Sequence, residues 1–297
     1  MSRHALLDRL RLRMGGMLMR ELTTRAQEPR GQTPSEALGT PRILAAMEDG
    51  GRIDGRTAAG YLYHSARISR TLGGCATCVD LGCGTGVQLL QVAAVNPETH
   101  FVGVDRCQKL LEQGASNMRR LGLTNVEWVC DDITAPTALH DRAFDAAIST
   151  MTLHDLVSVA AMTTCLKAIQ RLVGTKGAIY IEDFARLRSA RSMEFFVGMN
   201  APAVGDEFSD LYRASLGSAF TLEELRQVGV ELPGTRLYST FSVPFLVVIK
   251  TPDRHTPPAA LDRLRALRAS LGKVQSKDLE DLQRFFGLGG LRGDPFS

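Results

Sequence analysis

The stretch Cys78–Gly86 constrains the fold more than any other part of this 297-residue chain. A short apolar run ends at Leu81, and glycines follow at alternate positions, Gly82, Gly84 and Gly86. The residues after Gly86 place valines and leucines at helical spacing. Because glycine adopts positive φ and has no Cβ, its backbone can pass close to a ligand. The sequence therefore predicts a strand, a tight glycine turn and a helix beside a nucleotide-like ligand.

Apolar runs and helical patterns alternate through the middle of the chain. After the first strand the runs lie at 101–105, 126–130, 144–150 and 177–182, and a final pair lies at 236–240 and 245–249. Such alternation is typical of a sheet with helices on both faces. The sequence predicts an α/β fold with a doubly wound, mostly parallel seven-stranded sheet. The sheet is expected to end in an antiparallel strand pair, with helical extensions at both ends of the chain.

The same pattern divides the chain into three regions. Residues 1–56 are predicted to form an N-terminal helical extension and part of a lid, and residues 57–252 the core. Within the core, 184–220 is a long insertion that is expected to act as a substrate lid. Thr256-Pro257-Pro258 is typical of a linker, so 253–297 is predicted to be a C-terminal helical extension. Both extensions are candidates for packing on the core or for forming a homodimer.

Composition argues against several classes of protein. The net charge of +3 is too small to indicate a nucleic-acid surface, and no apolar run approaches the roughly 20 residues that span a bilayer. Arginines interrupt the N-terminal segment, which argues against a secretory leader, so a cytoplasmic protein is expected. Cys75 and Cys78 have C-x-x-C spacing, but no second Cys or His pair follows at metal-binding spacing. Reduced thiols and no metal site are predicted.

The spacing of the glycines separates two kinds of nucleotide-like ligand. The dinucleotide fingerprint is G-x-G-x-x-G, whereas here Val87 stands where its last glycine would be. The run Asp80-Leu81-Gly82-Cys83-Gly84-Thr85-Gly86 is instead similar to the first motif of another family. With Asp105 and Asp132 at the ends of the next two strands, the chain resembles the class I S-adenosylmethionine (SAM)-dependent methyltransferase family over about residues 57–250.

The resemblance implies that SAM is the cofactor and that it lies across the carboxyl ends of the first three strands. Asp105 corresponds to the acid that binds both ribose hydroxyls, and one carboxylate can indeed accept from two vicinal hydroxyls. Asp132 corresponds to the acid at the adenine amino group and Ile133 to the backbone at its ring nitrogen, while Thr150 lines the methyl-donor pocket. The cofactor-binding residues implied in this way are Asp80, Gly82, Cys83, Gly84, Gly86, Asp105, Arg106, Asp132, Ile133 and Thr150.

Acid-base residues are less clearly indicated, because methyl transfer depends largely on positioning and desolvation and needs a base only for a protonated acceptor. His154, just past the fourth strand, is the candidate base; the alternative is a histidine that packs or caps the next helix. Asp155 fits the N-cap of that helix. Glu182 and Asp183 are expected to follow the fifth strand, where acceptors enter. They are candidates for orienting a cationic acceptor or, with Asp155, for holding a metal, and no metal is predicted.

Two segments supply further candidate contacts to the substrate. Tyr61 and Tyr63 lie on the helix that covers the cofactor pocket in relatives, and each either touches a ligand or packs in the core. In the insertion, Phe195 and Tyr212 belong to an apolar set that either lines a pocket or forms a helix core. Together with Glu182, these four aromatic residues are the predicted acceptor contacts.

The sequence therefore favours transfer of a methyl group from SAM to an oxygen or nitrogen of a small molecule or peptide. The fourth strand lacks the Pro-Pro-aromatic motif of DNA and some RNA or protein amino-methyltransferases, and no Pro-Cys pair of the pyrimidine C5 enzymes is present. A nucleic-acid acceptor is accordingly not expected. Three alternatives stay open: a methyltransferase of RNA or protein, a SAM-dependent enzyme of another reaction type, and a non-catalytic SAM-binding scaffold or regulatory subunit.

Overall fold

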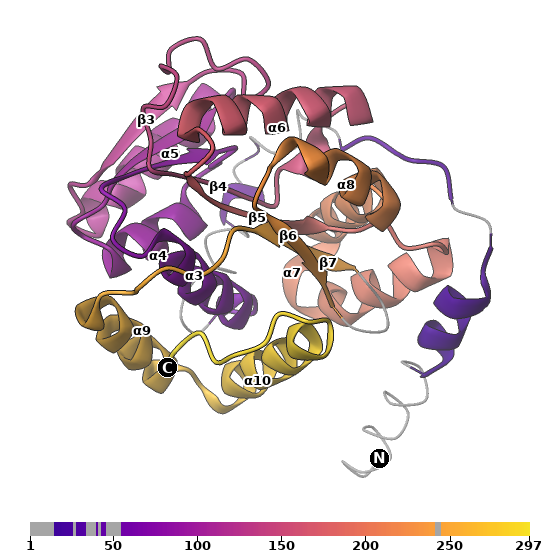
Figure 1. The fold of residues 1–297 in the computed structure, drawn as a ribbon. Coiled ribbons are helices and arrows are strands. Elements are labelled where there is room, and N and C mark those ends of the chain that lie inside the picture. Colours follow the sequence, from indigo (N-terminus) through magenta and orange to yellow (C-terminus); the bar gives the residue numbers. More distant parts are fainter. Residues whose placement is uncertain (1–14, 26–27, 34–39, 41–42, 46–54, 241–244) are drawn as a thin grey trace.

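The structure, a computed structural model, describes residues 15–25, 28–33, 40, 43–45, 55–240 and 245–297, and for 199–208 it describes the backbone alone. Most of the expected N-terminal extension, 1–56, lies outside these residues. The described chain is built around one seven-stranded sheet in the order β3-β2-β1-β4-β5-β7-β6 (Figure 1). The strands are β1 (Thr77–Leu81), β2 (His100–Asp105), β3 (Val126–Cys130), β4 (Ala146–Thr150), β5 (Ala178–Phe184), β6 (Arg236–Ser239) and β7 (Leu246–Lys250).

The predicted sheet is confirmed. Neighbouring strands are parallel except that β7 runs antiparallel to both β5 and β6. Successive strands are added on one side of β1 up to β3, and then the order switches to β4 on the other side. Ligands of open α/β sheets bind at such a switch, beyond the carboxyl ends of the strands. The topology alone therefore directs attention to the ends of β1 and β4.

Helices cover both faces of the sheet. The elements are α3 (Ala58–Leu72), α4 (Val87–Val95), α5 (Gln108–Arg120), α6 (Val159–Val173), α7 (Ala190–Ser218), α8 (Leu222–Val228), α9 (Pro258–Ser270) and α10 (Lys273–Leu288), with short 3-10 turns η2 (Leu153–Asp155) and η3 (Gly229–Glu231). Side chains of α3, α4, α9 and α10 form one buried cluster with alternate strand residues, and those of α6 and α8 form a second cluster on the opposite face. The core is thus two apolar layers separated by the sheet.

Two local expectations differ from the structure. β5 continues to Phe184, so Glu182 and Asp183 lie inside the strand, because β7 extends the ladder opposite them. The helix expected from Asp155 is instead the short turn η2 followed by α6, whose N-cap is Ser158, so Asp155 caps no helix. The insertion is mostly one 29-residue helix, α7. The expected capping box at Thr221 and Glu224 is present at the start of α8.

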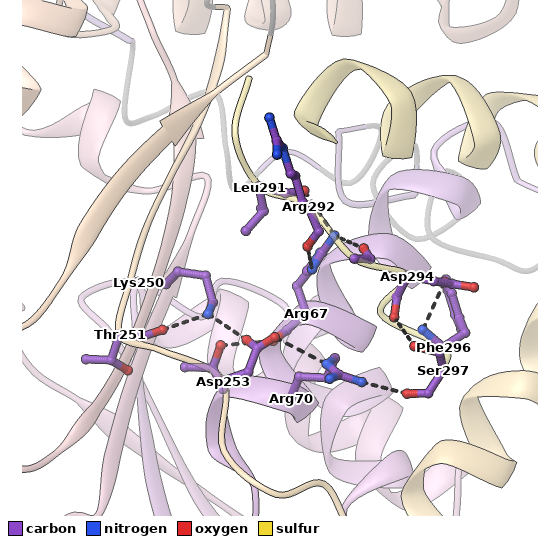
Figure 2. Close-up of polar contacts among 12 residues, drawn as sticks. Arg67, Arg70, Lys250, Thr251, Asp253, Leu291, Arg292, Asp294, Phe296 and Ser297 are labelled. Carbon is purple, nitrogen blue, oxygen red and sulfur yellow. Dashed lines mark hydrogen bonds and ion pairs between the residues drawn. The ribbon is translucent and has the colours of Figure 1, made fainter. Parts of the chain in front are cut away.

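The C-terminal helices pack on the core through α3. The ring of Phe286 on α10 stacks on Tyr63 with centroids 5.4 Å apart. Arg67, only 2% exposed, donates to the backbone carbonyls of residues 291–293 at 3.3, 3.3 and 2.6 Å. Figure 2 shows this guanidinium lying against the segment that follows α10. A single arginine of α3 thereby satisfies three consecutive carbonyls of a segment with no ladder of its own.

A second set of contacts in the same region joins the end of the sheet to α3. Lys250, at the end of β7, donates to Asp253 and to the carbonyl of Thr251, both at 2.6 Å. Arg70 donates to Asp253 at 3.2 Å and to the backbone oxygen of Ser297 at 2.6 Å (Figure 2). The carboxylate of Asp253 is therefore shared by two cations, which anchors the chain leaving the sheet.

The described N-terminal residues cross the other side of the molecule and contact α7. The buried carboxylate of Glu21 accepts from the backbone N–H groups of Arg188 and Ser189, at 2.8 and 3.2 Å. Ser189 is the N-cap of α7 and its own side chain makes no capping bond. Glu21 thus supplies from a distant segment the acceptor that a helix N-terminus requires.

Arg30 makes a more extensive contact farther along the same N-terminal region. Its guanidinium donates to the carbonyls of His154 and Val157, each at 3.0 Å, and of Ser218, at 2.6 Å. It also donates to the carbonyl of Leu156 and stacks over the ring of Phe220 at 4.0 Å. One side chain therefore joins the N-terminal segment to the turn after β4 and to the end of α7.

Candidate active site

The glycine turn after β1 is held against β2 by its own backbone. The N–H groups of Gly82 and Cys83 donate to the carbonyl of Val104 at 2.8 and 3.1 Å. Gly82, Gly84 and Gly86 have φ of +83°, +54° and +73°, which side chains with a Cβ rarely adopt. A Cβ added at Gly84 would meet no atom within 4 Å, so this glycine borders open space. The turn therefore leaves the backbone at Gly84 beside open space, where a ligand could approach it.

Gly86 is required for a different reason. A Cβ built on it would lie 2.4 Å from the ring of Trp128, and one built on Gly114 of α5 would lie 2.6 Å from the same ring. The two glycines leave room for Trp128 beneath the turn, with its indole nitrogen buried. The third glycine of the motif thus fits a structural need of this chain.

Asp105 ends β2 directly beneath the turn. Its carboxylate accepts from the N–H of Gly84 at 3.0 Å and from the N–H of Cys107 at 2.9 Å. Burial raises the pKa of Asp105, although these two bonds and the nearby Arg106 act against that shift. Each carboxylate oxygen keeps a free lone pair after these bonds, so the group can still accept from two hydroxyls.

Asp80 has no hydrogen-bond partner within the described structure. It is 1% exposed, and neither carboxylate oxygen has a donor in reach. Burial and the charge of Asp105 raise its pKa to about 8. A buried polar group without a partner is costly and points to a ligand that supplies one. Since the group is acidic, a cationic ligand would stabilise it best.

A pocket opens beside these groups. It is lined by Gly82, Asp105, Arg106, Cys107, Leu110, Asp132, Ile133, Thr152, Asp155 and Leu156. Asp132 follows β3 and uses one oxygen to accept from the N–H and hydroxyl of Thr134, at 2.8 and 2.7 Å, which leaves its second oxygen toward solvent. Ile133 adds an apolar wall. The predicted residues of the first three strand ends are therefore brought together.

The chemistry of these groups fits SAM. The open backbone at Gly84, the carboxylates of Asp105 and Asp132, and the unpartnered Asp80 offer a cradle for a ligand with hydroxyls, an amine-bearing ring and positive charge. A dinucleotide would bring pyrophosphate, which is anionic and unsuited to Asp80. Cys83 lies half-buried in the turn, and Thr150 ends β4 opposite Glu182 in the parallel register. Among the described residues no cluster of three His, Cys, Asp or Glu could hold a metal ion.

His154 lies in η2 and is bound to Asp183. Its Nδ1 is 2.7 Å from the Oδ1 of Asp183, and its backbone N–H donates to the other carboxylate oxygen at 3.0 Å. Burial by itself lowers the pKa of His154, but the charge and hydrogen bond of Asp183, joined by Asp155 and Glu182, outweigh burial and raise it to about 9. At neutral pH this imidazole is held protonated. A resting role as general base does not agree with that state.

Glu182 lies on the opposite side of β5 from Asp183. It is 3% exposed, and its Oε1 lies 3.5 Å from the Nε2 of His64 without forming a hydrogen bond. Burial and the charge of Asp183 raise its pKa to about 8, while the positive charge of His154 acts against this. The Tyr61 phenol on α3 is half-buried, and burial together with the charge of Glu182 raises its pKa to about 12. Glu182 and Tyr61 are therefore close enough for the charge of one to change the pKa of the other.

The remaining predicted substrate residues, Tyr63, Phe195 and Tyr212, lie in three different surroundings. Tyr63 is fully buried between α3 and α10, where its hydroxyl accepts from Arg67, so it packs in the core and is left out of the site. Phe195 packs with Phe196 in a cluster that includes Met17 of the N-terminal segment. Tyr212 of α7 contacts the ring of Phe184, at 5.7 Å, and Phe184 in turn contacts His154 at 5.4 Å. Of the two predicted insertion residues, Tyr212 is thus connected to His154 through one aromatic ring.

Two residues of the site were not found from the sequence. Thr152 donates to the carbonyl of Gly82 at 3.0 Å, and a Cβ on Gly82 would collide with it, so this threonine joins the glycine turn to the end of β4. Arg30 binds the carbonyl of His154 from more than a hundred residues away. A hydroxyl after a strand and a lone arginine in a polar segment carry no recognisable pattern. Neither could have been selected from the sequence.

Comparison with known proteins agrees with this geometry. Residues 74–211 match the family described as a methyltransferase domain. The plantazolicin methyltransferase BamL, solved with a triazolic desmethylPZN analog and SAH, has a TM-score of 0.55 at 16% identity over 82% of this chain and 86% of its own. An O-methyltransferase family protein from Burkholderia thailandensis has a TM-score of 0.55 at 15% identity, over 84% of this chain and 70% of its own. Both show a shared fold.

Sequence relatives are similar over shorter stretches. A tRNA (guanine-N(7)-)-methyltransferase of Rubrobacter xylanophilus is 37% identical over 54 residues, which is 18% of this chain and 24% of that enzyme. The curated relatives are matched over 9% to 33% of their own lengths. The strand order, the glycine turn and the match over residues 74–211 together show a class I SAM-dependent methyltransferase domain in this chain. No helix in the described ranges is both long and apolar enough to cross a membrane.

Proposed function

We propose that this chain transfers the methyl group of SAM to an oxygen or nitrogen nucleophile of a small molecule or peptide. The observation that carries the proposal is the buried, unpartnered carboxylate of Asp80 beside Asp105 and the open turn at Gly84. SAM, when bound, supplies a methyl group on a positively charged sulfur. Asp105 would hold its ribose, Asp132 its adenine amino group, and Asp80 its cationic portion.

The protein's contribution to the reaction would be positioning and exclusion of water. The acceptor would lie beyond the ends of β4 and β5, where Tyr61, Glu182 and Tyr212 gather and where α7 contacts η2. We assign His154 a positioning role: its bond to Asp183 holds η2 against β5. Of the two roles considered for His154, we favour packing over that of general base, because Asp183 keeps the imidazole charged.

Cofactor binding gives a direct test. Thermal unfolding of the chain should shift upward with S-adenosylhomocysteine (SAH) and not with NAD, because a ligand that binds the native state stabilises it. Asp105→Ala should abolish the shift, since the ribose loses its acceptor. Asp262→Ala, at an exposed acid of α9 outside the pocket lining, is the matched control. A shift produced by NAD alone would overturn the proposal.

A methyltransferase of RNA is the second candidate, and the similarity to tRNA (guanine-N(7)-)-methyltransferases favours it. Labelled methyl transfer from SAM into size-fractionated cell extract, with and without ribonuclease, separates the two. Label that stays in the small-molecule and peptide fractions after ribonuclease supports the first candidate. Label that requires intact RNA, with salt-sensitive binding, would favour the second. SAH binding with no label in any fraction would instead indicate a non-catalytic scaffold.

A further inference from the structure

We infer that the acceptor is a protonated amine and that Glu182 binds its positive charge and takes up its proton. The inference rests on the proposed methyl transfer and names the acceptor class of that same site. Glu182 is a buried carboxylate in the middle of the acceptor region whose Oε1 has no hydrogen-bond partner. An isolated buried charge is costly unless it is paired. A ligand that carries a positive charge would supply the pair.

The neighbours of Glu182 do not neutralise it. On its own strand Tyr180 is an uncharged phenol that bonds to the Nδ1 of His64 at 2.7 Å. Burial and the charge of Arg67 lower the pKa of His64 to about 3, so this imidazole is neutral. Tyr61, from α3, is uncharged as well, since its pKa is about 12. The face of α3 toward Glu182 therefore brings polar groups without charge.

The cation that acts on Glu182 among the described residues, His154, is already paired. His154 is charged, but its imidazole bonds to Asp183 at 2.7 Å, and Asp155 lies 3.5 Å from its other nitrogen. His154 with Asp183 is a neutral pair, and Glu182 lies beyond it with a pKa raised to about 8, so it stays largely protonated until a cation pairs with it. Arg30, which contacts this turn, is occupied by four backbone carbonyls. Among the described residues, the charge count at the ends of β4 and β5 therefore leaves a position for one added cation, which would lower the pKa of Glu182 and ionise it.

This charge count separates an amine from the other common acceptors. An ammonium group is attracted to Glu182 and becomes nucleophilic once its proton has moved to the carboxylate. A phenol reacts as the phenolate, which has the same charge as ionised Glu182 and would keep this carboxyl protonated and unable to act as a base. A neutral alcohol brings no positive charge to ionise Glu182 and needs a stronger base than a carboxylate. His154, held charged by Asp183, does not supply that base.

The reaction moves one proton to Glu182 and one methyl group to the amine nitrogen. The ammonium N–H proton passes to the Glu182 carboxylate, which leaves a neutral amine with a free electron pair. That pair forms the new bond from nitrogen to the methyl carbon, while the carbon–sulfur bond breaks and its electrons stay on sulfur as a neutral thioether. The methylated product carries the positive charge, and the proton on Glu182 is released to water on product departure.

A residue with strained backbone, Met151, lies beside Glu182 at the end of β4. Met151 has φ of +51°, which is rare for a residue with a side chain, and is 39% exposed. Its N–H donates to the carbonyl of Glu182 at 2.9 Å, so the strained residue lies directly beside the carboxylate's own backbone. Strained backbone of this kind gathers at binding sites because the surrounding structure holds it there. A partly exposed, strained residue beside Glu182 agrees with a binding role for this strand end.

The test uses the full chain and asks whether acetylation of amines in the extract removes the acceptor. Size-fractionated extract is divided, and one portion is treated with N-acetoxysuccinimide and then hydroxylamine, which leaves acetyl groups on amines and removes them from oxygen and sulfur. Labelled methyl transfer from SAM is then measured in both portions. We expect the acetylated portion to lose nearly all of the label. Label retained there would show an oxygen or other acceptor and overturn the inference while leaving methyl transfer intact.

A variant then tests the residue. Glu182→Gln should lower kcat/KM for the labelled amine by about 100-fold, the scale expected when one partner of a buried charge pair is removed. SAH binding, measured by calorimetry, should stay unchanged, and Glu98→Gln, at an exposed glutamate, is the matched control. Loss of SAH affinity in Glu182→Gln would assign this carboxylate to the cofactor and overturn the inference. Absence of label with the unaltered chain would overturn both the inference and the proposed function.

Discussion

Arg30 and Arg67 both join a terminal region to the core, but Arg30 lies in the terminal region and Arg67 lies in the core. Each donates to several backbone carbonyls and thereby holds a terminal region on the core. Arg67, on the core helix α3, donates hydrogen bonds to the segment after α10. Arg30, in the N-terminal region, donates hydrogen bonds to the core. The planar guanidinium suits both contacts, because its donors reach several carbonyls at once.

The difference lies in what each arginine touches. Arg67 lies on the side of α3 that faces α10, beside Tyr63, and its partners are remote from the strand ends. Arg30 binds the carbonyls of the turn that contains His154 and the end of α7, which borders the acceptor region. The C-terminal contact is therefore expected to matter mainly for stability, and the N-terminal contact for the position of the turn that contains His154.

The largest effect is expected from Arg67→Ala. Removing a buried guanidinium leaves three carbonyls without donors and should lower the free energy of unfolding by about 3 kcal/mol. Arg284→Ala, at an exposed arginine of α10, is the control. Denaturant unfolding measures the loss, and SAH affinity of the folded fraction should not change. A comparable loss in Arg284→Ala would refute the special role of Arg67.

Arg30→Ala should cost less stability and more activity. Arg30 is half-buried, so we expect a loss of about 1 kcal/mol in unfolding free energy. Hydrogen exchange at the amides of Asp155 and Leu156, which donate within η2, should accelerate while the amides of α10 stay protected. Labelled methyl transfer should fall more than the stability loss explains. Equal exchange changes in η2 and α10 would remove the distinction between the two arginines.

The smallest effect is expected from pH. The folded-state pKa of His154 is raised above its ordinary value of 6.5 to about 9, so its stabilising contribution is present below about pH 6.5 and lost as pH rises through 9. Glu182 and Asp80, both raised to about 8, act in the same direction from lower pH. Thermal unfolding of the free chain should therefore occur at lower temperature at pH 9 than at pH 6.5. His154→Gln should reduce this dependence, and an unchanged slope would argue against the His154–Asp183 ion pair.

The cofactor half of the site could be predicted from the sequence because its determinants are local. Each acid lies at the end of a short apolar strand, and the glycine turn is contiguous, so strand ends and motif are recognised together. The exception is Asp80, whose lack of a partner depends on what packs over β1. That isolation, and not the motif alone, is what makes it a strong indicator of a cationic ligand.

The acceptor half depends on contacts between distant segments, and there the sequence was a poorer guide. Glu182 and Asp183 were expected after β5, but pairing with β7 extends the strand through both of them. Whether a tyrosine of α3 faces the site or the core is decided by where α10 packs, which separates Tyr61 from Tyr63. Arg30 reaches its partners across the whole fold, and no local pattern encodes such a contact.

The room left by Gly86 and Gly114 has a practical consequence. Trp128, which they accommodate, is the single tryptophan of the chain. Its indole lies against the glycine turn at Gly86. Intrinsic tryptophan fluorescence is therefore expected to report ligand binding at the glycine turn without any chemical label.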